Sequence, residues 1–480
     1  MRDDEPRLPA VPHLPHSADP RLTAAATAIR GAIDTIAAIA TAPGRGALAI
    51  VRMSGTGAEQ VAARTISPWP VAPRVATLAT IRDPASGTVV DRALVTRFEN
   101  GRSFTGEPSV EISTHGGAVS SALVLAALVS AGARPALPGE FTRRAVLNGK
   151  LTLAQGEAIG DVIDATSRLA HRVALDALDG GLVRRVLALR DALLELEALI
   201  AYDIDFPEED DGPIAPERIM ASARRVGSML DALVATAPAG ELVRNGALVV
   251  LAGPPNAGKS SLFNALLGDA RALVTPIPGT TRDAIEAVID APGWPLRLVD
   301  TAGLRESTDA IERLGIEVSE RYLARAQVVL ACAEGAADLA DVRQRISAMA
   351  PAPVIGVLTK QDLATTSDDA GGGDDVVLVS AETGAGLGEL LARIERVLEG
   401  AAGPIASDTP VVTRARHLAA LQVAADEMRS FVSSWESGEL PAPVIAVHLR
   451  AAVTALEELV GVVDTEDVLD RVFRSFCVGK

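Results

Sequence analysis

A glycine-rich loop between an apolar run and a helical pattern constrains this chain more than any other feature of its sequence. The apolar run 249–252 leads into G-P-P-N-A-G-K-S at 253–260, and residues 261–267 then have the apolar spacing of a helix. A bound phosphate chain needs close backbone N–H groups, the positive end of a helix, a lysine and a hydroxyl that can bind a metal ion. The G-x-x-x-x-G-K-S spacing supplies all of these, which predicts a phosphate-binding P-loop.

Two later motifs support this prediction. The segment G-T-T-R-D at 279–283 offers a threonine for magnesium in a switch loop, and R-L-V-D-T-A-G at 297–303 ends a second apolar strand with an aspartate on the metal side. Both lie where a P-loop nucleotide hydrolase needs them. A chance match is the alternative for the loop alone, in a chain with 41 glycines, but the two further motifs disfavour it.

The segment T-K-Q-D at 359–362 predicts that the nucleotide is GTP rather than ATP. Guanine presents N1–H and 2-amino donors, and the carboxylate of Asp362 can accept from both. Ser380 and Ala381 follow the next strand, as in GTPases. Thr359 stands where asparagine is usual. Because threonine has no carboxamide to bridge neighbouring loops, we expect a looser base pocket.

Leu304 occupies the position at which Ras-type GTPases carry a glutamine that orients water. An aliphatic side chain cannot orient water, so another group must do so, and something else must neutralise the phosphate charge. The segment 305–317 offers Arg305, Glu306, Glu312 and Glu317.

Composition limits the class of protein. At 480 residues the chain is expected to form two to four domains, and 48% hydrophobic residues with only 3% aromatic ones suit helical bundles and parallel sheets. Two cysteines are too few for a disulfide framework or a metal site, which favours the cytoplasm. Charged residues interrupt each apolar run before the roughly 20 residues that a membrane helix needs. The formal charge of −17 means that any RNA contact must be local or shared with another protein.

The sequence predicts a multidomain protein of the α/β and α+β classes, divided into five segments. Residues 1–33 are predicted to be a disordered extension, or to follow a start codon placed too early, and the acids at 3–5 disfavour a transit peptide. Residues 34–150 alternate short strands (36–40, 47–52, 92–98 and 110–114) with turns and one helix, 118–131. Segments 151–245 and 403–480 are helical, with helices expected at 153–178, 182–204, 215–235, 413–435, 444–460 and 465–476. The nucleotide motifs lie between them, in 246–402, with further strands at 328–333, 353–358 and 376–379.

From residue 34 to the end the chain resembles tRNA modification GTPases of the MnmE (TrmE) family. The marks are P-G-R-G at 43–46, S-F-T-G-E at 103–107, H-G-G at 115–117, P-G-E-F at 138–141, L-N-G-K at 147–150, the two nucleotide motifs at 255–261 and 279–283, and the terminal F-C-V-G-K. The resemblance implies an N-terminal folate-binding and dimerisation domain (34–150), a discontinuous helical domain (151–245 and 403–480) and an inserted Ras-like P-loop GTPase domain (246–402).

The resemblance also implies an activity and its partners. Together with the FAD-dependent protein MnmG, the family adds a carboxymethylaminomethyl or aminomethyl group at C5 of the wobble uridine in certain tRNAs. The one-carbon unit comes from 5,10-methylene-tetrahydrofolate, for which 5-formyl-tetrahydrofolate is an analogue. A homodimer, a heterotetramer with MnmG, tRNA bound largely through that partner, and no membrane association are implied.

Site residues follow position by position from the resemblance. It places folate contacts at Arg52, Glu111, Lys150 and Lys480, magnesium on Ser260 and Thr281, potassium on Asn256, Thr275, Ile277 and Thr280, and the orientation of water on Glu312. Potassium would stand where other GTPases insert an arginine finger, and would stabilise charge in the transition state. The GTP contacts are Asn256, Ala257, Gly258, Lys259, Ser260, Ser261, Thr275, Thr280, Thr281, Asp300, Thr301, Ala302, Gly303, Thr359, Lys360, Asp362, Ser380 and Ala381.

The two cysteines have different expectations. Cys477 resembles the C-terminal cysteine that the family is proposed to use in chemistry near the folate, and a small apolar residue in a final helix is the equally weighted alternative. Cys332, inside an apolar strand, is predicted to be a core residue.

Two rival functions stay open at this point. A regulatory GTPase switch in ribosome assembly would use similar nucleotide motifs, but it would need neither the 34–150 domain nor the C-V-G-K terminus. A scaffold with a degenerate nucleotide site would turn over no GTP in either potassium or sodium.

Overall fold

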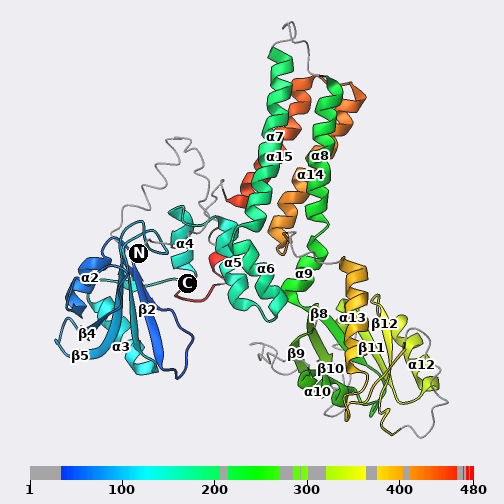
Figure 1. Cartoon of the computed structure of the whole chain (residues 1–480), viewed down its shortest axis with the longest axis horizontal. Coiled ribbons are helices and arrows are strands. Elements are labelled where there is room, and N and C mark those ends of the chain that lie inside the picture. The colour runs from blue at the N-terminus through cyan, green and yellow to red at the C-terminus, as the bar shows by residue number, and fades with distance from the viewer. Residues whose placement is uncertain are drawn as a thin grey trace, which may run out of the picture. The chain divides into compact units, whose positions relative to one another are not determined.

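The computed structural model describes residues 34–205, 215–269, 285–291, 293–300, 321–363, 376–403, 410–461, 469, 472–474 and 476–479. These residues form two compact units. The first contains the chain up to Gly160 together with its last residues from Val460, and the second contains Asp161–Leu459 (Figure 1). The predicted extension 1–33 lies outside the described residues.

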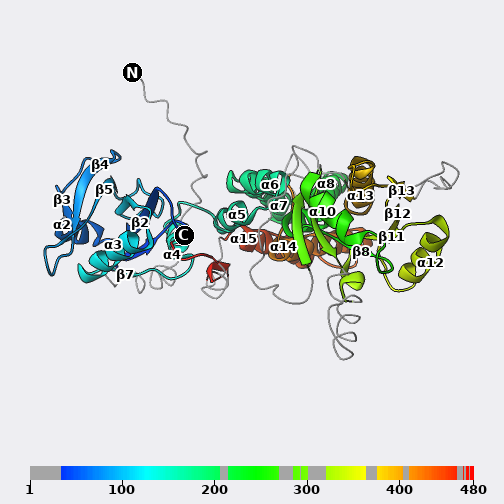
Figure 2. The ribbon, with the colours of Figure 1, turned by 90° about the horizontal axis from the view of Figure 1, so that it is seen from below.

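The first unit is built on a seven-stranded sheet with the order β3-β4-β5-β6-β2-β1-β7. The strands are β1 (Ile36–Ile39), β2 (Leu48–Ser54), β3 (Ile66–Ser67), β4 (Thr77–Arg82), β5 (Val89–Phe98), β6 (Ser109–His115) and β7 (Arg134–Pro135). Helices α2 (Ala58–Thr65) and α3 (Ala118–Ser130) pack their apolar residues on one face of this sheet (Figure 2). The predicted strands and helix of this segment are confirmed. Strand β4 was not predicted, because only two of its residues, Ala79 and Ile81, are buried apolar residues.

An ion network fixes helix α4 (Glu140–Leu147) against the edge of the sheet. Arg134 on β7 pairs with both Asp34 and Glu140, at 2.6 Å each, and Arg144 pairs with Glu140 at 2.9 Å. Burial would raise the pKa of Glu140, but hydrogen bonds from Arg134, from the Leu137 N–H and from Arg144 outweigh it and hold that pKa below its ordinary value. The carboxylate therefore stays charged, and α4 is held in place beside β1.

The helices of the second unit come from two distant parts of the sequence. They are α6 (Arg168–Leu178), α7 (Gly181–Asp205), α8 (Pro216–Val234), α9 (Ala237–Asn245), α14 (Ala415–Ser437) and α15 (Ala442–Val460), preceded by α5 (Leu153–Asp164). Helix α8 packs against both α7 and α14 (Figure 1). Arg224 pairs with Glu436 at 2.6 Å, and Asp231 pairs with Arg429 at 2.9 Å. These ion pairs join helices that lie far apart in the sequence, and no local sequence pattern predicts their contact.

One predicted helix is wrong in its length. The expected single helix 153–178 is divided into α5 and α6, because the side chain of Ser167 caps the second helix by accepting a hydrogen bond from the N–H of Ala170 at 3.0 Å. Apolar spacing continues through the break, and for that reason periodicity did not reveal it.

In the described part of the chain, the helical stretch Pro216–Asn245, which comprises α8 and α9, is long and apolar enough by composition to cross a membrane. Its most apolar stretch has a mean hydropathy of 1.2, and 39% of that stretch is buried. A core helix of a bundle meets the same criteria, and α8 has such packing partners. This helix is therefore weak evidence for a membrane span.

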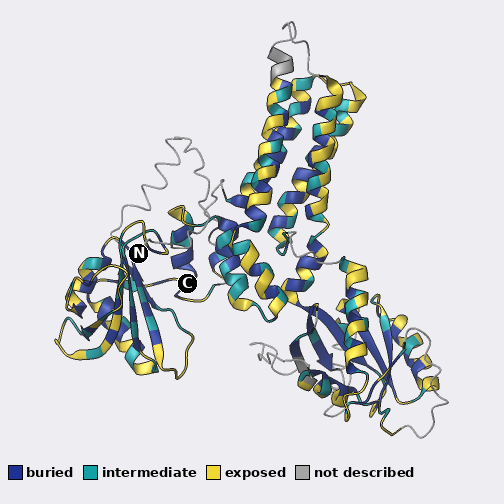
Figure 3. Cartoon of the chain, in the orientation of Figure 1, coloured by how far each residue is buried: buried dark blue, intermediate teal, exposed yellow. Residues whose placement is uncertain are grey.

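The remainder of the second unit is a six-stranded sheet with the order β13-β12-β11-β8-β10-β9. The strands are β8 (Ala247–Ala252), β9 (Ile285–Asp290), β10 (Pro295–Asp300), β11 (Val328–Ala333), β12 (Val354–Leu358) and β13 (Val376–Leu378), and all pairings except β9 with β10 are parallel. Helices α10 (Lys259–Asp269) and α13 (Leu387–Ala402) share one apolar core with the sheet, and α12 (Ala336–Ser347) shares the other. Every residue of β8 and β11 is buried (Figure 3). The predicted multidomain α/β and α+β class is confirmed.

Candidate functional site

The P-loop connects β8 to α10, and its backbone explains its glycines. Gly253 has φ +154°, and a β-carbon on it would lie 2.2 Å from the carbonyl oxygen of Cys332 on the neighbouring strand β11. Gly258 and Asn256 also have positive φ, of +73° and +63°. The first is a conformation that glycine adopts without strain, and asparagine tolerates it better than most residues. The loop is thus pressed onto the carboxyl edge of the sheet, where parallel α/β folds bind nucleotides.

Ser260 and Asp300 form the pair that a magnesium ion needs. Strands β8 and β10 are parallel neighbours with Leu251 opposite Asp300, so the end of β10 lies beside the start of α10. The hydroxyl of Ser260 donates to the carboxylate of Asp300 at 2.6 Å. A hydroxyl and a carboxylate are oxygen ligands of the kind that Mg²⁺ prefers, with phosphate and water as the others. These two residues therefore fit the ion.

Lys259 is folded over the loop. It is 5% exposed, and its ammonium group donates to the carbonyls of Gly253 and Pro254 at 3.0 and 2.7 Å. Cys332, on β11, is fully buried, and this burial raises the pKa of the thiol to about 12. The thiol is therefore uncharged at neutral pH, and the prediction that Cys332 belongs to the core is confirmed.

Two cavities border the P-loop. One, of about 820 Å³, is lined by the loop with Lys259 and by α12. The other, of about 520 Å³, is lined by Ser261 of α10 and by the residues predicted to read guanine, among them Lys360, Asp362 and Ala381. Asp362 is oriented by the hydroxyl of Ser380, which donates to it at 2.6 Å. The structure therefore brings together, around one loop, the described residues expected to hold phosphate and base.

A second constellation lies in the first unit, where Arg52 and Glu111 face each other on β2 and β6. The two residues are register partners, and the guanidinium donates to the carboxylate at 3.0 Å. The guanidinium carbon lies 5.5 Å from the ring centre of Phe104 and 5.7 Å from that of Phe141. Phe141 is fully buried on α4, whereas Phe104 is 40% exposed. An arginine between two rings, with one open side, is a fixed cationic group that a ligand can reach.

Lys150 and Arg52 meet the same loop, residues 101–106. The ammonium group of Lys150 donates to the carbonyl of Gly101 at 3.1 Å, and Phe104, which stacks on Arg52, belongs to that loop. Three of the four residues expected to contact folate are therefore gathered around one loop, and the fourth, Lys480, lies outside the described residues.

Comparison with known proteins decides the family. A family model described as "MnmE helical domain" matches residues 153–477, and one described as "GTP-binding protein TrmE N-terminus" matches residues 35–150. The chain belongs to the MnmE family of tRNA modification GTPases. It is 40% identical to the tRNA modification GTPase MnmE of Moorella thermoacetica over 462 residues, which cover 93% of this chain and 99% of that protein.

Further MnmE proteins are equally similar over their whole length. Identity is 42% with the protein of Heliobacterium modesticaldum (93% of this chain and 99% of that one) and 42% with that of a Thermus thermophilus strain (94% and 100%). Among solved structures, the G domain of the T. maritima FeoB iron transporter covers 32% of this chain and 98% of its own, with 30% identity and a TM-score of 0.25. Membership of the MnmE family makes the chain a GTP hydrolase that acts in tRNA modification, so the rival function as a ribosome-assembly switch is set aside.

Thr359 corrects an expectation about the MnmE base pocket in this chain. Its buried hydroxyl lies 3.0 Å from the carbonyl oxygen of Ala257 in the P-loop and 3.2 Å from that of Ala333 at the end of β11. Threonine thus bridges these neighbouring segments through its hydroxyl. The expectation that it could not bridge them, for want of a carboxamide, is wrong.

This bridge predicts a measurable role. Replacing Thr359 with valine keeps the shape but removes the hydroxyl donor of the Ala257 carbonyl, which costs roughly 1–2 kcal/mol, whereas the Ala333 carbonyl still accepts from the backbone N–H of residue 359. We expect GDP affinity, measured by fluorescence titration, to fall by about 5- to 30-fold. Serine at 359 keeps the hydroxyl and serves as the control. An unchanged affinity in the valine variant would show that the bridge does not support the P-loop.

Cys477 is not a buried residue of a final helix. It is exposed and lies outside helical structure, and its carbonyl accepts a hydrogen bond from the N–H of Gly139 at 3.3 Å. A β-carbon on Gly479 would lie 2.5 Å from the carbonyl oxygen of Ile39 on β1, the strand in which Ala38 is the register partner of Arg52. The C-terminal tail therefore runs one strand away from Arg52, and the buried-residue alternative is wrong.

The aromatic neighbours of Arg52 were missed by the sequence analysis. Phe104 and Phe141 lie inside the S-F-T-G-E and P-G-E-F motifs, but neither was given a role. With only 8 phenylalanines in the chain, a phenylalanine in each of two such motifs was the available signal.

Several predicted residues lie outside the described part of the chain. They are Thr275, Ile277, Thr280, Thr281, Thr301, Ala302, Gly303, Glu312 and Lys480. Their roles therefore stay predictions.

Proposed function

We propose that this chain is a potassium-dependent GTPase that acts as a homodimer with an FAD-dependent MnmG partner to modify C5 of the wobble uridine in certain tRNAs. Membership of the MnmE family shows the general function, which is GTP hydrolysis in tRNA modification. The observation that best supports the more specific proposal, folate-dependent one-carbon chemistry, is the Arg52–Glu111 pair beside two phenylalanines. A GTPase that acts only as a switch does not need such a site.

In the nucleotide site, the chain's own residues bind and neutralise the phosphates. The P-loop amides and the start of α10 provide donors for the phosphate oxygens, and Lys259 adds a positive charge. Ser260 and Asp300, together with Thr281, would hold the magnesium ion, which would supply charge neutralisation for the phosphates. Glu312 is proposed to orient the attacking water. Leu304, in the glutamine position, cannot do this.

Potassium is proposed to bind through Asn256, Thr275, Ile277 and Thr280. Asn256 is the only member of this set within the described residues, and it supports the assignment through its position. It is exposed in the middle of the P-loop, and its backbone has a φ of +63°, which is the left-handed region. A carboxamide oxygen at this point suits a monovalent cation beside the phosphates.

A reduced folate is proposed to bind at Arg52, Glu111, Lys150 and Lys480. A pterin ring carries the same amino and ring N–H donors as guanine, and the carboxylate of Glu111 can accept from them. Phe104 offers an exposed ring for stacking, Arg52 holds the Glu111 carboxylate beside it, and Lys150 suits a carboxylate of the folate tail. When bound, 5,10-methylene-tetrahydrofolate supplies the one-carbon unit. The exposed Cys477 on the adjacent tail is proposed to take part in this chemistry.

The folate site can be tested by titrating 5-formyl-tetrahydrofolate into the full-length chain and measuring heat. We expect micromolar binding to the unchanged chain. In R52A the affinity should fall by roughly 10- to 100-fold, because a charge-assisted hydrogen bond contributes about 1.5–3 kcal/mol. The matched control is R97A, which removes an arginine of the same sheet that forms a 2.6–2.9 Å ion pair with Glu59. Equal losses in the two variants, or no binding to the unchanged chain, would contradict the site.

The chain is proposed to work in the cytoplasm and to bind tRNA largely through MnmG. Its charge of −17 supports this division, because a surface of that sign repels a polyanion except where arginines gather.

A further inference from the structure

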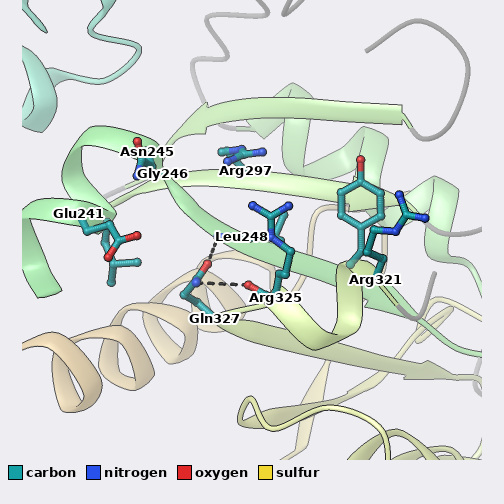
Figure 4. A pocket seen from close by; sticks show the side chains of 10 residues that line it. Glu241, Asn245, Gly246, Leu248, Arg297, Arg321, Arg325 and Gln327 are labelled. Carbon is teal, nitrogen blue, oxygen red and sulfur yellow. Dashed lines mark hydrogen bonds between the residues drawn. The ribbon is translucent and has the colours of Figure 1, made fainter. Parts of the chain in front are cut away.

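A cavity lined by arginines lies at the edge of the second unit's sheet that is opposite the P-loop. Its volume is about 730 Å³, and it is bordered by the end of α9, the starts of β8 and β10, and the segment 321–327 before β11 (Figure 4). The P-loop follows the other end of β8, so this cavity is separate from the nucleotide site.

Among the residues that the structure describes, three guanidinium groups line the cavity, those of Arg297, Arg321 and Arg325, against one carboxylate, that of Glu241. Arg321 and Arg325 are exposed and stand one helical turn apart, which places them on the same face of residues 321–325. Glu241 lies at the far end of the cavity from Arg321 (Figure 4). The cavity is thus strongly cationic in a chain whose formal charge is −17.

The local structure holds these groups in place. The Gln327 side chain accepts a hydrogen bond from the N–H of Leu248 at 2.7 Å and donates to the carbonyl of Arg325 at 3.3 Å, which ties the arginine segment to β8 (Figure 4). Gly246 has φ +75°, and a β-carbon there would lie 2.9 Å from Cγ of Arg297. The stem of Arg297 therefore crosses a position that only glycine leaves open.

The guanidinium groups of Arg321 and Arg325 make no hydrogen bond or ion pair with any residue that the structure describes. The like charges of Arg321 and Arg325 repel each other, and an anion that binds between them removes this cost. A planar guanidinium presents parallel N–H donors that fit an oxygen pair of a phosphate group. The cavity therefore has the charge and the donor geometry to bind a phosphate group.

We propose that this arginine cavity binds the phosphodiester backbone of tRNA. Arg321 and Arg325 are exposed to solvent, so a long polyanion can reach them. A chain with a formal charge of −17 needs a local cationic cluster to contact RNA. The inference rests on the tRNA substrate of the proposed function, but not on folate, potassium or GTP turnover.

The test measures the affinity of the full-length, nucleotide-free chain for unmodified tRNA at a series of KCl concentrations. Each lost phosphate contact lowers the slope of log K against log salt by about 0.7–0.9. We expect R321A/R325A to reduce the slope by roughly 1.4–1.8 and to weaken binding on the order of tenfold at 0.1 M salt. R321K/R325K keeps the charges and should retain most of the slope.

The control is R172A/R185A, which removes two exposed arginines from α6 and α7. Unchanged GDP affinity in the R321A/R325A chain shows that its nucleotide domain is folded. The inference is overturned if R321A/R325A and the control have the same slope, or if the unchanged chain shows no affinity for tRNA at low salt. Neither result would bear on GTP turnover or wobble uridine modification, which are measured separately.

Discussion

Replacing Lys259 with alanine should lower kcat/KM for GTP by roughly 10²- to 10³-fold. Lys259 is the only lysine of the P-loop, and it is 5% exposed, with its ammonium group bound to the carbonyls of Gly253 and Pro254. From this position it needs only a rotation of its side chain to reach phosphate oxygens. One preorganised donor to a developing charge contributes about 2.7–4 kcal/mol, which sets the expected loss.

The measurement is steady-state release of phosphate from GTP in the full-length chain. R396A is a suitable control, because it removes one positive charge from an exposed position on α13 of the same sheet domain. Circular dichroism and thermal unfolding of both variants establish that they are folded. A K259A chain that turns over GTP within threefold of the unchanged chain would exclude the P-loop as the catalytic site.

Exchanging potassium for sodium should lower the rate of GTP hydrolysis at least tenfold. An arginine finger contributes roughly 10³–10⁵ in comparable enzymes, and a potassium ion that replaces it must supply a substantial part of this stabilisation. Sodium is smaller, so the same ligands do not close on it. The measurement compares phosphate release in the two salts at equal ionic strength.

The Asn256 variant connects this effect to the structure. Asn256 has φ +63°, so glycine removes the carboxamide without adding backbone strain, whereas alanine would add it. We expect N256G to hydrolyse GTP at similar low rates in potassium and in sodium. Equal rates in the two salts for the unchanged chain would refute the potassium site, and no turnover in either salt would favour the degenerate-scaffold alternative.

Short, regular motifs allowed much of the nucleotide site to be predicted from sequence. A P-loop depends on local backbone geometry, so glycine, lysine and serine at fixed spacing are enough to place it. Asp300 and Asp362 were predictable because they end or closely follow buried apolar strands, and the carboxyl ends of parallel strands meet at one edge.

Features that depend on tertiary contacts were not predictable in the same way. The Thr359 bridge needs the P-loop and β11 to approach the end of β12, which no local pattern records. The break at Ser167 is invisible to apolar periodicity, and the exposure of Cys477 follows from the tail lying along β1. The arginine cavity joins residues 241–248, 297 and 321–327, which are separated in sequence by strands and loops.

Mass spectrometry of the wobble uridine in total tRNA tests the central claim most directly. Cells that lack this chain should lose the C5 aminomethyl-type modification, the unchanged chain should restore it, and K259A should not. If the modification persists in cells without the chain, or if K259A restores it fully, the chain is not the GTPase of this reaction.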